Sequence, residues 1–441
     1  MRMTVIGTGY LGAVHAACMA DLGHDVLGVD VDEAKLAALA AGRTPFYEPG
    51  LPEILARTVA SGNLRFSTSL EEAADFGEVH FLCVGTPQQP GSAAADMRPI
   101  DSVIEGLAPH LRDDCLVVGK STVPVGTSDR LAARIAELAP VGARAEVAWN
   151  PEFLSESTAV EDTLRPDRIV VGVTSHRAEA VLGAVYSTMR ESGTPYLVTD
   201  RTTAELVKVS ANAFLATKVS FVNAMAEVCE ATGGDVTTLA KAIGYDPRIG
   251  HRFLAAGVGF GGGCLPKDIR AFSARADELG FGDSLRFLRD VDEINMRARQ
   301  RTVDRARTML DGRFLGRRVA VLGAAFKSGS DDVRDSPALA VAASIQLQGA
   351  HVRVHDPEAL DNARAAFPCL DYAREPEKAC EGADLVLHLT DWAEYRDLNP
   401  AELAGVVDVP RLLDARNTLD LEHWRTHGWD VGALGRGNLA A

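Results

Sequence analysis

The sequence predicts an α/β protein with two doubly wound parallel sheets, joined by a long central helix and a helical middle domain. Three observations support this fold class. Short runs rich in β-branched residues alternate with helical patterns through the first 200 residues, as they do in parallel sheets. A helical pattern free of Gly and Pro then covers residues 202–232, and the alternation returns from residue 318.

The first domain, assigned to residues 1–200, is expected to contain the first parallel sheet. Its predicted strands are short and apolar, and helical patterns at residues 11–22 and 101–111 lie between some of them. Because parallel neighbours need crossover connections, this alternation favours a doubly wound sheet. The strands cover residues 4–6, 25–30, 79–84, 116–119, 146–149, 168–173 and 196–198.

The middle domain, residues 201–311, is predicted to be helical. A helix over residues 202–232 would extend about 45 Å at roughly 1.5 Å per residue, which exceeds the width of a small domain. The segment therefore connects domains, and an exposed apolar stripe on it would suit a homodimer. After a helical block at residues 285–311, the third domain, residues 312–441, has the strand pattern again. Its strands cover residues 319–322, 352–355, 385–389 and 411–414.

Composition excludes several classes of protein. A net charge of −16 over 441 residues argues against a sequence-independent grip on nucleic acid or an anionic membrane. Apolar runs stay shorter than the roughly 18 residues of a membrane span. The seven cysteines are scattered without CxxC pairs, which favours reduced cytoplasmic thiols over disulfides or a metal site.

A glycine-rich turn, Gly7-Thr8-Gly9-Tyr10-Leu11-Gly12, follows the first predicted strand and opens a helix. This spacing allows a tight turn, a close approach of backbone to a pyrophosphate, and helix–strand packing, as in Rossmann-like domains. Asp30 ends the second strand, 18 residues after Gly12. A carboxylate there accepts from a ribose 2′-hydroxyl and repels a 2′-phosphate, so NAD is the expected cofactor. Lys35 either reaches the adenosine ribose or phosphate or is a solvated helix lysine.

The strongest chemical signal is Cys264, at the end of a run with five glycines in seven residues, 257–263. A thiol is a good nucleophile near neutral pH and a good acyl leaving group. Lys267 and Asp268 follow closely. A buried structural cysteine is the alternative for an isolated thiol, but the glycines and the adjacent charges favour a catalytic one.

Further polar residues lie where a catalytic site is expected. Lys208 and Asn212 are four residues apart in the predicted long helix, hence on one face. Glu152 and Glu156 follow the strand at residues 146–149, and Thr122 follows an earlier strand. Ligands bind at these carboxyl ends in open α/β sheets.

Together, these motifs resemble the UDP-glucose/GDP-mannose dehydrogenase family, and its UDP-glucose 6-dehydrogenases in particular, along essentially the whole chain. The resemblance implies NAD-dependent oxidation of a primary alcohol at C6 of a nucleotide sugar to a carboxylate, in two hydride transfers. The matching motifs are Gly7–Gly12, Val84-Gly85-Thr86-Pro87, Ser121–Gly126, Pro151–Glu156, Lys208 with Asn212, Gly259–Asp268, Phe326-Lys327, Asp331-Asp332-Val333-Arg334 and Asp414-Ala415-Arg416-Asn417.

The resemblance also implies roles for individual residues. Cys264 would capture the aldehyde as a thiohemiacetal that becomes a thioester. The other catalytic residues would be Lys208, Asn212, Asp268, Glu152 and Thr122. Those expected to contact the cofactor are Gly7, Gly9, Tyr10, Leu11, Gly12, Asp30, Lys35, Thr86, Pro87, Thr122, Glu156 and Arg334. Those expected to contact a UDP-sugar are Glu152, Phe153, Leu154, Glu156, Lys208, Asn212, Arg248, Phe260, Gly261, Lys267, Phe326, Lys327 and Arg416, of which Arg248 would reach the partner subunit's substrate.

Some positions depart from the commonest family pattern, which leaves alternatives open. Gly263 stands where serine is frequent, and Leu265-Pro266 where Phe-Pro or Phe-Gln is usual. UDP-glucose is the leading substrate, with GDP-mannose and TDP-glucose as alternatives, whereas Lys267 speaks against N-acetylhexosamine nucleotides. A non-catalytic NAD-binding protein and a simple two-electron hydroxyacid dehydrogenase are the rivals from other classes. For any single arginine, a surface salt bridge is the competing interpretation.

Overall fold

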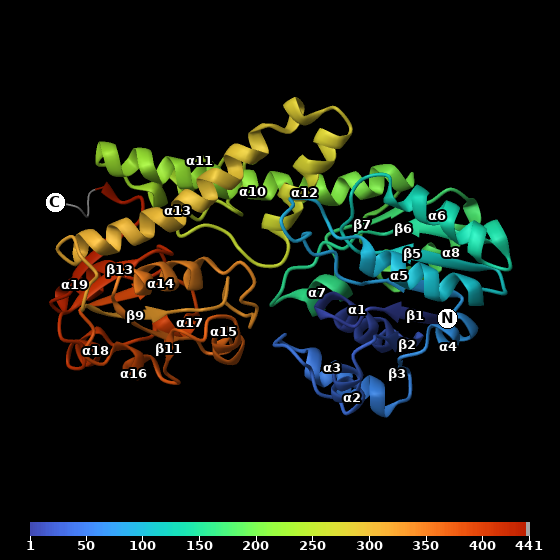
Figure 1. Cartoon of the computed structure of the whole chain (residues 1–441), viewed down its shortest axis with the longest axis horizontal. Helices are drawn as coiled ribbons and strands as arrows, with labels where there is room; N and C mark the ends of the chain where they lie inside the picture. The colour runs from blue at the N-terminus through green and yellow to red at the C-terminus, as the bar shows by residue number, and fades with distance from the viewer. Residues whose placement is uncertain (438–441) are drawn as a thin grey trace. The chain divides into compact units, whose positions relative to one another are not determined.

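The computed structural model describes residues 1–437 and contains two compact units, each built around one sheet. The first unit comprises residues 1–211 with 274–279, and the second comprises residues 212–273 with 280 onward. The division passes through helices α10 (Arg201–Thr232) and α12 (Leu265–Glu278). Figure 1 shows both sheets with the helices that cover them.

The first sheet has eight strands in the order β3-β2-β1-β4-β5-β6-β7-β8. Strands β1 to β6 are parallel and follow the 3-2-1-4-5-6 order of dinucleotide-binding sheets, which bind ligands where the order reverses. The edge pair β7–β8 runs the other way, because β7 meets β6 antiparallel at Trp149 and Gly172. The strands are β1 (Arg2–Ile6), β2 (Asp25–Val29), β3 (Leu64–Ser67), β4 (Val79–Leu82), β5 (Cys115–Gly119), β6 (Ala145–Trp149), β7 (Ile169–Gly172) and β8 (Tyr196–Thr199).

Side-chain alternation builds a core on each face of this sheet. Met3 and Val5 face the core that contains α1, whereas Ile6 faces the core that contains α5. Ser69 caps α4 by accepting from the Glu72 backbone N–H, which is a capping box in the sequence. The helices are α1 (Tyr10–Asp21), α2 (Glu33–Ala40), α3 (Leu51–Ala60), α4 (Leu70–Phe76), α5 (Arg98–Leu107), α6 (Thr127–Leu138), α7 (Ala159–Leu164), α8 (His176–Val185) and α9 (Ser187–Glu191).

The second sheet has six parallel strands in the order β11-β10-β9-β12-β13-β14, which repeats the order of the first six strands. They are β9 (Arg318–Leu322), β10 (His351–His355), β11 (Asp371–Tyr372), β12 (Leu385–His388), β13 (Arg411–Asp414) and β14 (Asp430–Ala433). Around them lie α14 (Pro337–Leu347), α15 (Leu360–Ala366), α16 (Pro376–Cys380), α17 (Ala393–Arg396), α18 (Pro400–Ala404) and α19 (Leu421–Thr426). Between the sheets in sequence are α10, α11 (Val236–Gly244), α12 and α13 (Phe287–Met309).

The predicted fold class is confirmed. The long helix begins one residue before the predicted range and ends with it, and α13 lies inside the predicted block at 285–311. Strands β3, β11 and β14 were not predicted. Within residues 1–437, we find no helix with the length and apolarity needed to span a membrane.

Asp356 organises the first turn of the second sheet. It directly follows β10, as Asp30 directly follows β2, but its side chain is fully buried. Its Oδ2 accepts from the Ala324 and Ala325 backbone N–H groups, at 2.7 and 3.0 Å, and from the Trp392 indole at 3.1 Å. Both oxygens are occupied, because Oδ1 accepts two further backbone N–H groups. Protein groups therefore fill the turn after β9, whereas the corresponding turn after β1 is accessible.

We expect Asp356→Ala to lower the free energy of unfolding by about 3 kcal/mol or more, because buried backbone donors would lose their acceptor. Asp361→Ala is the matched control, since its side chain is 96% exposed on α15, and should change stability by less than about 0.5 kcal/mol. Denaturant unfolding of both variants measures the difference. Equal midpoints would contradict the structural role of Asp356.

Candidate functional site

The glycine-rich turn has the geometry of an anion-binding turn. Gly7 follows β1 with φ of +92°, and α1 begins three residues later. A β-carbon at Gly12 would lie 1.7 Å from the Gly7 carbonyl oxygen, whereas one at Gly9 would meet open space. Gly12 is therefore required for packing, and Gly9 leaves room for a ligand at the positive N-terminus of α1. These features fit a dinucleotide pyrophosphate.

Asp30 lies beside this turn and is held by hydrogen bonds. Its Oδ2 accepts from the Thr8 backbone N–H at 2.8 Å and from the Lys35 ammonium at 3.1 Å. The Asp32 backbone N–H donates to Oδ1. Burial alone would raise the pKa of Asp30, but these bonds outweigh it and hold the pKa below its usual range. Asp30 is therefore a carboxylate at neutral pH, and Lys35 pairs with it.

The loops that follow β4 and β5 are tied together. The Thr86 hydroxyl donates to the Thr122 carbonyl at 2.7 Å, and the Ser121 hydroxyl donates to the Val84 carbonyl at 2.6 Å. Thr86 is buried, and Pro87 continues its loop. The structure thus brings Thr86 and Thr122 together at the carboxyl edge of the sheet.

Glu152 and Lys208 form an ion pair that is nearly sealed from water. Their charged atoms are 3.0 Å apart, and only 11% and 6% of the two side chains are exposed. Glu152 also accepts from the Leu154 backbone N–H at 2.6 Å. The Phe153 ring lies under the Arg168 guanidinium, with Lys208 at 5.7 Å from the ring centre. Glu156 lies farther along this loop and is half-buried.

Cys264 is exposed at the start of α12, so it is not a buried structural cysteine. Its carbonyl accepts from the Asp268 backbone N–H at 3.0 Å, which is a helical turn. The Asp268 carboxylate is buried, accepts from the Asn212 amide at 2.7 Å, and pairs with Lys267. The second unit therefore places an amide, a carboxylate and an ammonium one turn beyond a thiol. The N-terminus of α12 favours negative charge on that thiol.

The loop before Cys264 is fixed by its neighbours. The Gly262 backbone N–H donates to the Arg334 carbonyl at 2.9 Å. A β-carbon at Gly261 would lie 2.3 Å from the Asp335 carbonyl oxygen, and one at Gly262 would lie 2.8 Å from the Phe326 ring. Phe326 therefore packs directly against the loop.

The Arg416 guanidinium donates hydrogen bonds to backbone carbonyls of the protein. Its Nε donates to the Leu389 carbonyl at 2.6 Å, and Nη2 donates to the Phe326 carbonyl at 3.0 Å. Burial lowers the pKa of its guanidinium. The Lys327 ammonium lies 5.7 Å from the centre of the Phe326 ring. Arg416 therefore links the loops after β9, β12 and β13, in addition to any role toward a ligand.

Arg248 and Arg334 are more exposed, at 87% and 63% of their side chains. Each forms a two-pronged ion pair with the carboxylate two residues earlier, Asp246 and Asp332 respectively. Both guanidinium groups are thus surface ion-pair partners that remain accessible to water.

Comparison with known proteins assigns the family. Residues 1–190 match the NAD binding domain of the UDP-glucose/GDP-mannose dehydrogenase family, residues 202–297 its central domain, and residues 320–421 its UDP binding domain. A UDP-glucose 6-dehydrogenase from Rhizobium meliloti is 41% identical over 438 residues, which are 99% of this chain and 100% of the relative. The chain belongs to the UDP-glucose/GDP-mannose dehydrogenase family. It is an NAD-dependent oxidoreductase.

Solved structures agree with this assignment. The structure of a UDP-glucose dehydrogenase from Pyrobaculum islandicum has a TM-score of 0.89 to the dehydrogenase described here, at 38% identity over 96% of both chains. A GDP-mannose dehydrogenase from Pseudomonas aeruginosa has a TM-score of 0.54 at 28% identity, with 95% of this chain and 97% of that one covered. The likeness to the first structure is the greater of the two.

Two residues of α13 that hold the glycine-rich loop of the dehydrogenase were not predicted. Asn295 is fully buried, accepts from the Phe260 backbone N–H at 2.7 Å, and donates to the Phe260 carbonyl at 3.0 Å. Arg299 donates to the same carbonyl and pairs with Asp335. A sequence signal existed, because Asn295 interrupts the buried stripe of α13. That stripe is Leu288, Val291, Asn295, Ala298 and Thr302.

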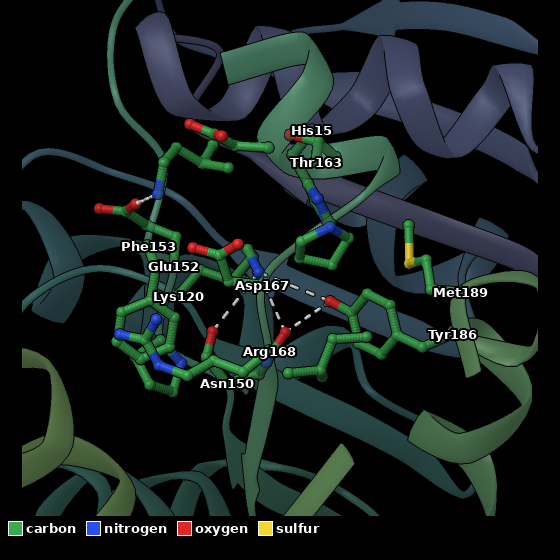
Figure 2. A pocket seen from close by; sticks show the side chains of 15 residues that line it. His15, Lys120, Asn150, Glu152, Phe153, Thr163, Asp167, Arg168, Tyr186 and Met189 are labelled. Carbon is green, nitrogen blue, oxygen red and sulfur yellow. Dashed lines mark hydrogen bonds between the residues drawn. The ribbon is translucent and has the colours of Figure 1, made fainter. Parts of the chain in front are cut away.

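Lys120 is a buried lysine in a pocket of the first unit, next to Glu152 (Figure 2). Only 6% of Lys120 is exposed, and its ammonium lies 3.0 Å from the Asn150 side-chain oxygen and 3.5 Å from the Tyr186 hydroxyl. The Asn150 amide donates to the Val170 carbonyl at 2.8 Å. Burial lowers the pKa of Lys120 to about 8. The network fixes the end of β6, from which the Glu152 loop departs.

We expect the stability of Lys120→Met relative to wild type to depend on pH. Between the folded-state pKa of about 8 and the ordinary value of 10.5, the unfolded wild-type chain binds a proton that the folded one does not. The free energy of unfolding of the wild type therefore rises with pH in that window, relative to the variant, by about 3 kcal/mol.

Denaturant unfolding of both proteins at pH 7 and pH 10 measures this effect. Lys378→Met is the control, because the Lys378 side chain is 64% exposed and its removal should give a gap that does not change with pH. A constant gap between wild type and Lys120→Met would show that the lysine titrates normally.

Proposed function

We propose that the dehydrogenase oxidises C6 of UDP-glucose to a carboxylate, giving UDP-glucuronate. The observation that carries the proposal is Cys264, exposed at the start of α12, with Asp268, Asn212 and Lys267 one turn away. Oxidation of an alcohol to an aldehyde needs no thiol, whereas covalent capture by a thiol allows a second oxidation of the same carbon. The match to a UDP binding domain supports a uridine nucleotide.

The three parts of the chain divide the work in this proposal. Residues 1–200 bind NAD, residues 201–311 carry the thiol and the dimer surface, and residues 312–441 bind the nucleotide of the sugar. NAD accepts a hydride twice for each sugar. The residues proposed to contact NAD are Gly7, Gly9, Tyr10, Leu11, Gly12, Asp30, Lys35, Thr86, Pro87, Thr122, Glu156 and Arg334. We place the reaction in the cytoplasm, where thiols stay reduced.

Lys208 and Asn212 act in the first oxidation. They polarise the C6 oxygen as hydride leaves the carbon, and the hydroxyl proton leaves through the Lys208–Glu152 pair. The burial of that pair supports this role, because a sealed ion pair interacts strongly with charge that develops on the substrate. Donors of this kind typically contribute roughly 10²–10³-fold to the rate.

Cys264 acts in the second oxidation. Its sulfur adds to the aldehyde carbon while the aldehyde oxygen gains a proton, which gives a thiohemiacetal. Loss of the second hydride from that carbon to NAD, together with the hydroxyl proton, would leave a thioester. Water then adds to the thioester carbon, the carbon–sulfur bond breaks, and the acid and the thiol are released. Asp268, with Thr122 and Glu152, holds the water and takes its proton.

Substrate selection is assigned to the loops around these groups. The residues proposed to contact the sugar nucleotide, besides the catalytic ones, are Phe153, Leu154, Glu156, Phe260, Gly261, Lys267, Phe326, Lys327 and Arg416, with Arg248 reaching the substrate of a second subunit. The run Cys264–Asp268 also occurs in the GDP-mannose form of the reaction, so GDP-mannose is the second candidate. The 41% identity to a UDP-glucose 6-dehydrogenase over 99% of this chain favours UDP-glucose.

The proposal is tested by following NADH with UDP-glucose, TDP-glucose, GDP-mannose and UDP-N-acetylglucosamine. We expect the highest kcat/KM with UDP-glucose and two NADH per sugar. One NADH per sugar would contradict the thioester scheme. A higher kcat/KM with GDP-mannose would make GDP-mannose the substrate in place of UDP-glucose.

Cys264→Ser should lose turnover by several orders of magnitude yet bind NADH normally. Cys369→Ser is the control, because that thiol is also exposed, and should keep the wild-type rate.

We propose that the dehydrogenase is a homodimer that pairs through α10. Phe214, Phe221 and Val228 are spaced seven residues apart on this helix, and 68%, 49% and 52% of their surfaces are exposed. Apolar residues at a seven-residue spacing form the contact stripe of paired helices. A second copy of the chain provides an identical stripe, as the two-fold symmetry of most dimers requires.

Phe221→Asp should convert the dimer to a monomer, because it places a charge in the middle of this stripe. Leu347→Asp is the control, because Leu347 is 88% exposed on α14, away from the stripe. Sedimentation equilibrium of the wild type and both variants measures the mass. A monomeric wild type, or a dimeric Phe221→Asp variant, would exclude this surface.

A further inference from the structure

Glu48 is a buried carboxylate in the loop that precedes α3, and only 2% of it is exposed. Its Oε2 accepts from the Tyr10 hydroxyl and from the Ser157 backbone N–H at 2.8 Å. Its Oε1 accepts from the Val160 backbone N–H at 3.3 Å. One carboxylate therefore connects the glycine-rich turn at residues 7–12 with the end of the loop that follows β6.

Tyr10 contributes its backbone to the glycine-rich turn and its hydroxyl to the contacts with Glu48 and Ser157. It is the first residue of α1, so its backbone lies at the helix N-terminus where an anion binds. Its side chain packs on Phe46, with ring centres 4.7 Å apart, and its hydroxyl also accepts from the Ser157 N–H at 3.1 Å. A ligand that binds the turn at residues 7–12 therefore contacts Tyr10, which donates a hydrogen bond to Glu48.

The backbone of Ser157, in the loop that follows β6, has an unfavourable conformation that its hydrogen bonds maintain. Its φ of +74° lies in the left-handed region, which costs a non-glycine residue free energy. The bonds from its N–H to Glu48 and Tyr10 maintain this conformation. The same loop carries Glu152 and Glu156, so its order determines where these carboxylates lie.

We propose that Glu48 is a positioning residue that couples occupation of the cofactor turn to the order of the loop at residues 150–160. The catalytic consequence rests on the proposed function, because it requires Glu152 to act in the reaction. The coupling itself requires only that NAD binds the turn. By linkage, an ordered loop also strengthens binding at the turn.

Hydrogen exchange of the full chain, with and without NADH, tests the coupling. We expect NADH to slow exchange in residues 150–160 of the wild type by about tenfold. In Glu48→Gln, protection of the turn at residues 7–12 should remain, while the effect on residues 150–160 should be lost. Glu53→Gln is the control, because it makes the same charge change at an exposed position on α3.

Tyr10→Phe gives a second route if Glu48→Gln does not fold, because it removes a single hydroxyl from the network. Equal NADH protection of residues 150–160 in the wild type and in the variants would overturn the proposal. Both variants should also lower kcat by about tenfold, through misplacement of Glu152. The double variant should be no worse than either single one. A wild type that shows the coupling but does not oxidise UDP-glucose would refute the proposed function and leave this inference intact.

Discussion

The buried Glu152–Lys208 ion pair is the interaction on which the proposed chemistry depends. Charges removed from water are costly unless they are paired, so each of these groups fixes the other. Glu152 is set by the end of β6 and by the Leu154 N–H, and Lys208 is set by α10. One turn farther along the same helix, Asn212 holds the buried Asp268 in the first turn of α12. Each of the two contacts joins buried groups, so the polar residues are held in place within their own unit.

The sequence predicted the strands that are buried on both faces of their sheet. Strands such as β5 and β12 are fully buried and read as continuous apolar runs. The three missed strands, β3, β11 and β14, have four, two and four residues and form edges of their sheets. Strands β3 and β11 are only partly buried and lack such runs, and Gly432 interrupts the apolar run of β14. Pattern also cannot give direction, and β7 proved antiparallel to β6 because the chain re-enters the sheet from the opposite end.

The site was predictable where its residues are adjacent in the sequence. The turn at residues 7–12 and the run before Cys264 are motifs of consecutive residues. Glu48 and Asn295 do not, because they act through contacts with residues 109 and 35 positions away in the chain. Asp356 also escaped notice, although it occupies the same place after the second strand as Asp30. Only the structure shows that the Trp392 indole also donates to Asp356 and encloses it, whereas Asp30 pairs with Lys35.

The glycines before Cys264 are needed for close packing. A β-carbon at Gly259 would lie 2.5 Å from the Asn295 side-chain oxygen, and one at Gly263 would lie 2.3 Å from the centre of the Arg334 guanidinium. Gly263 therefore leaves the space that the Arg334 guanidinium occupies. A larger residue would have to displace the guanidinium. The absence of a side chain at Gly263 therefore lets the Arg334–Asp332 ion pair lie against the residue that precedes the thiol.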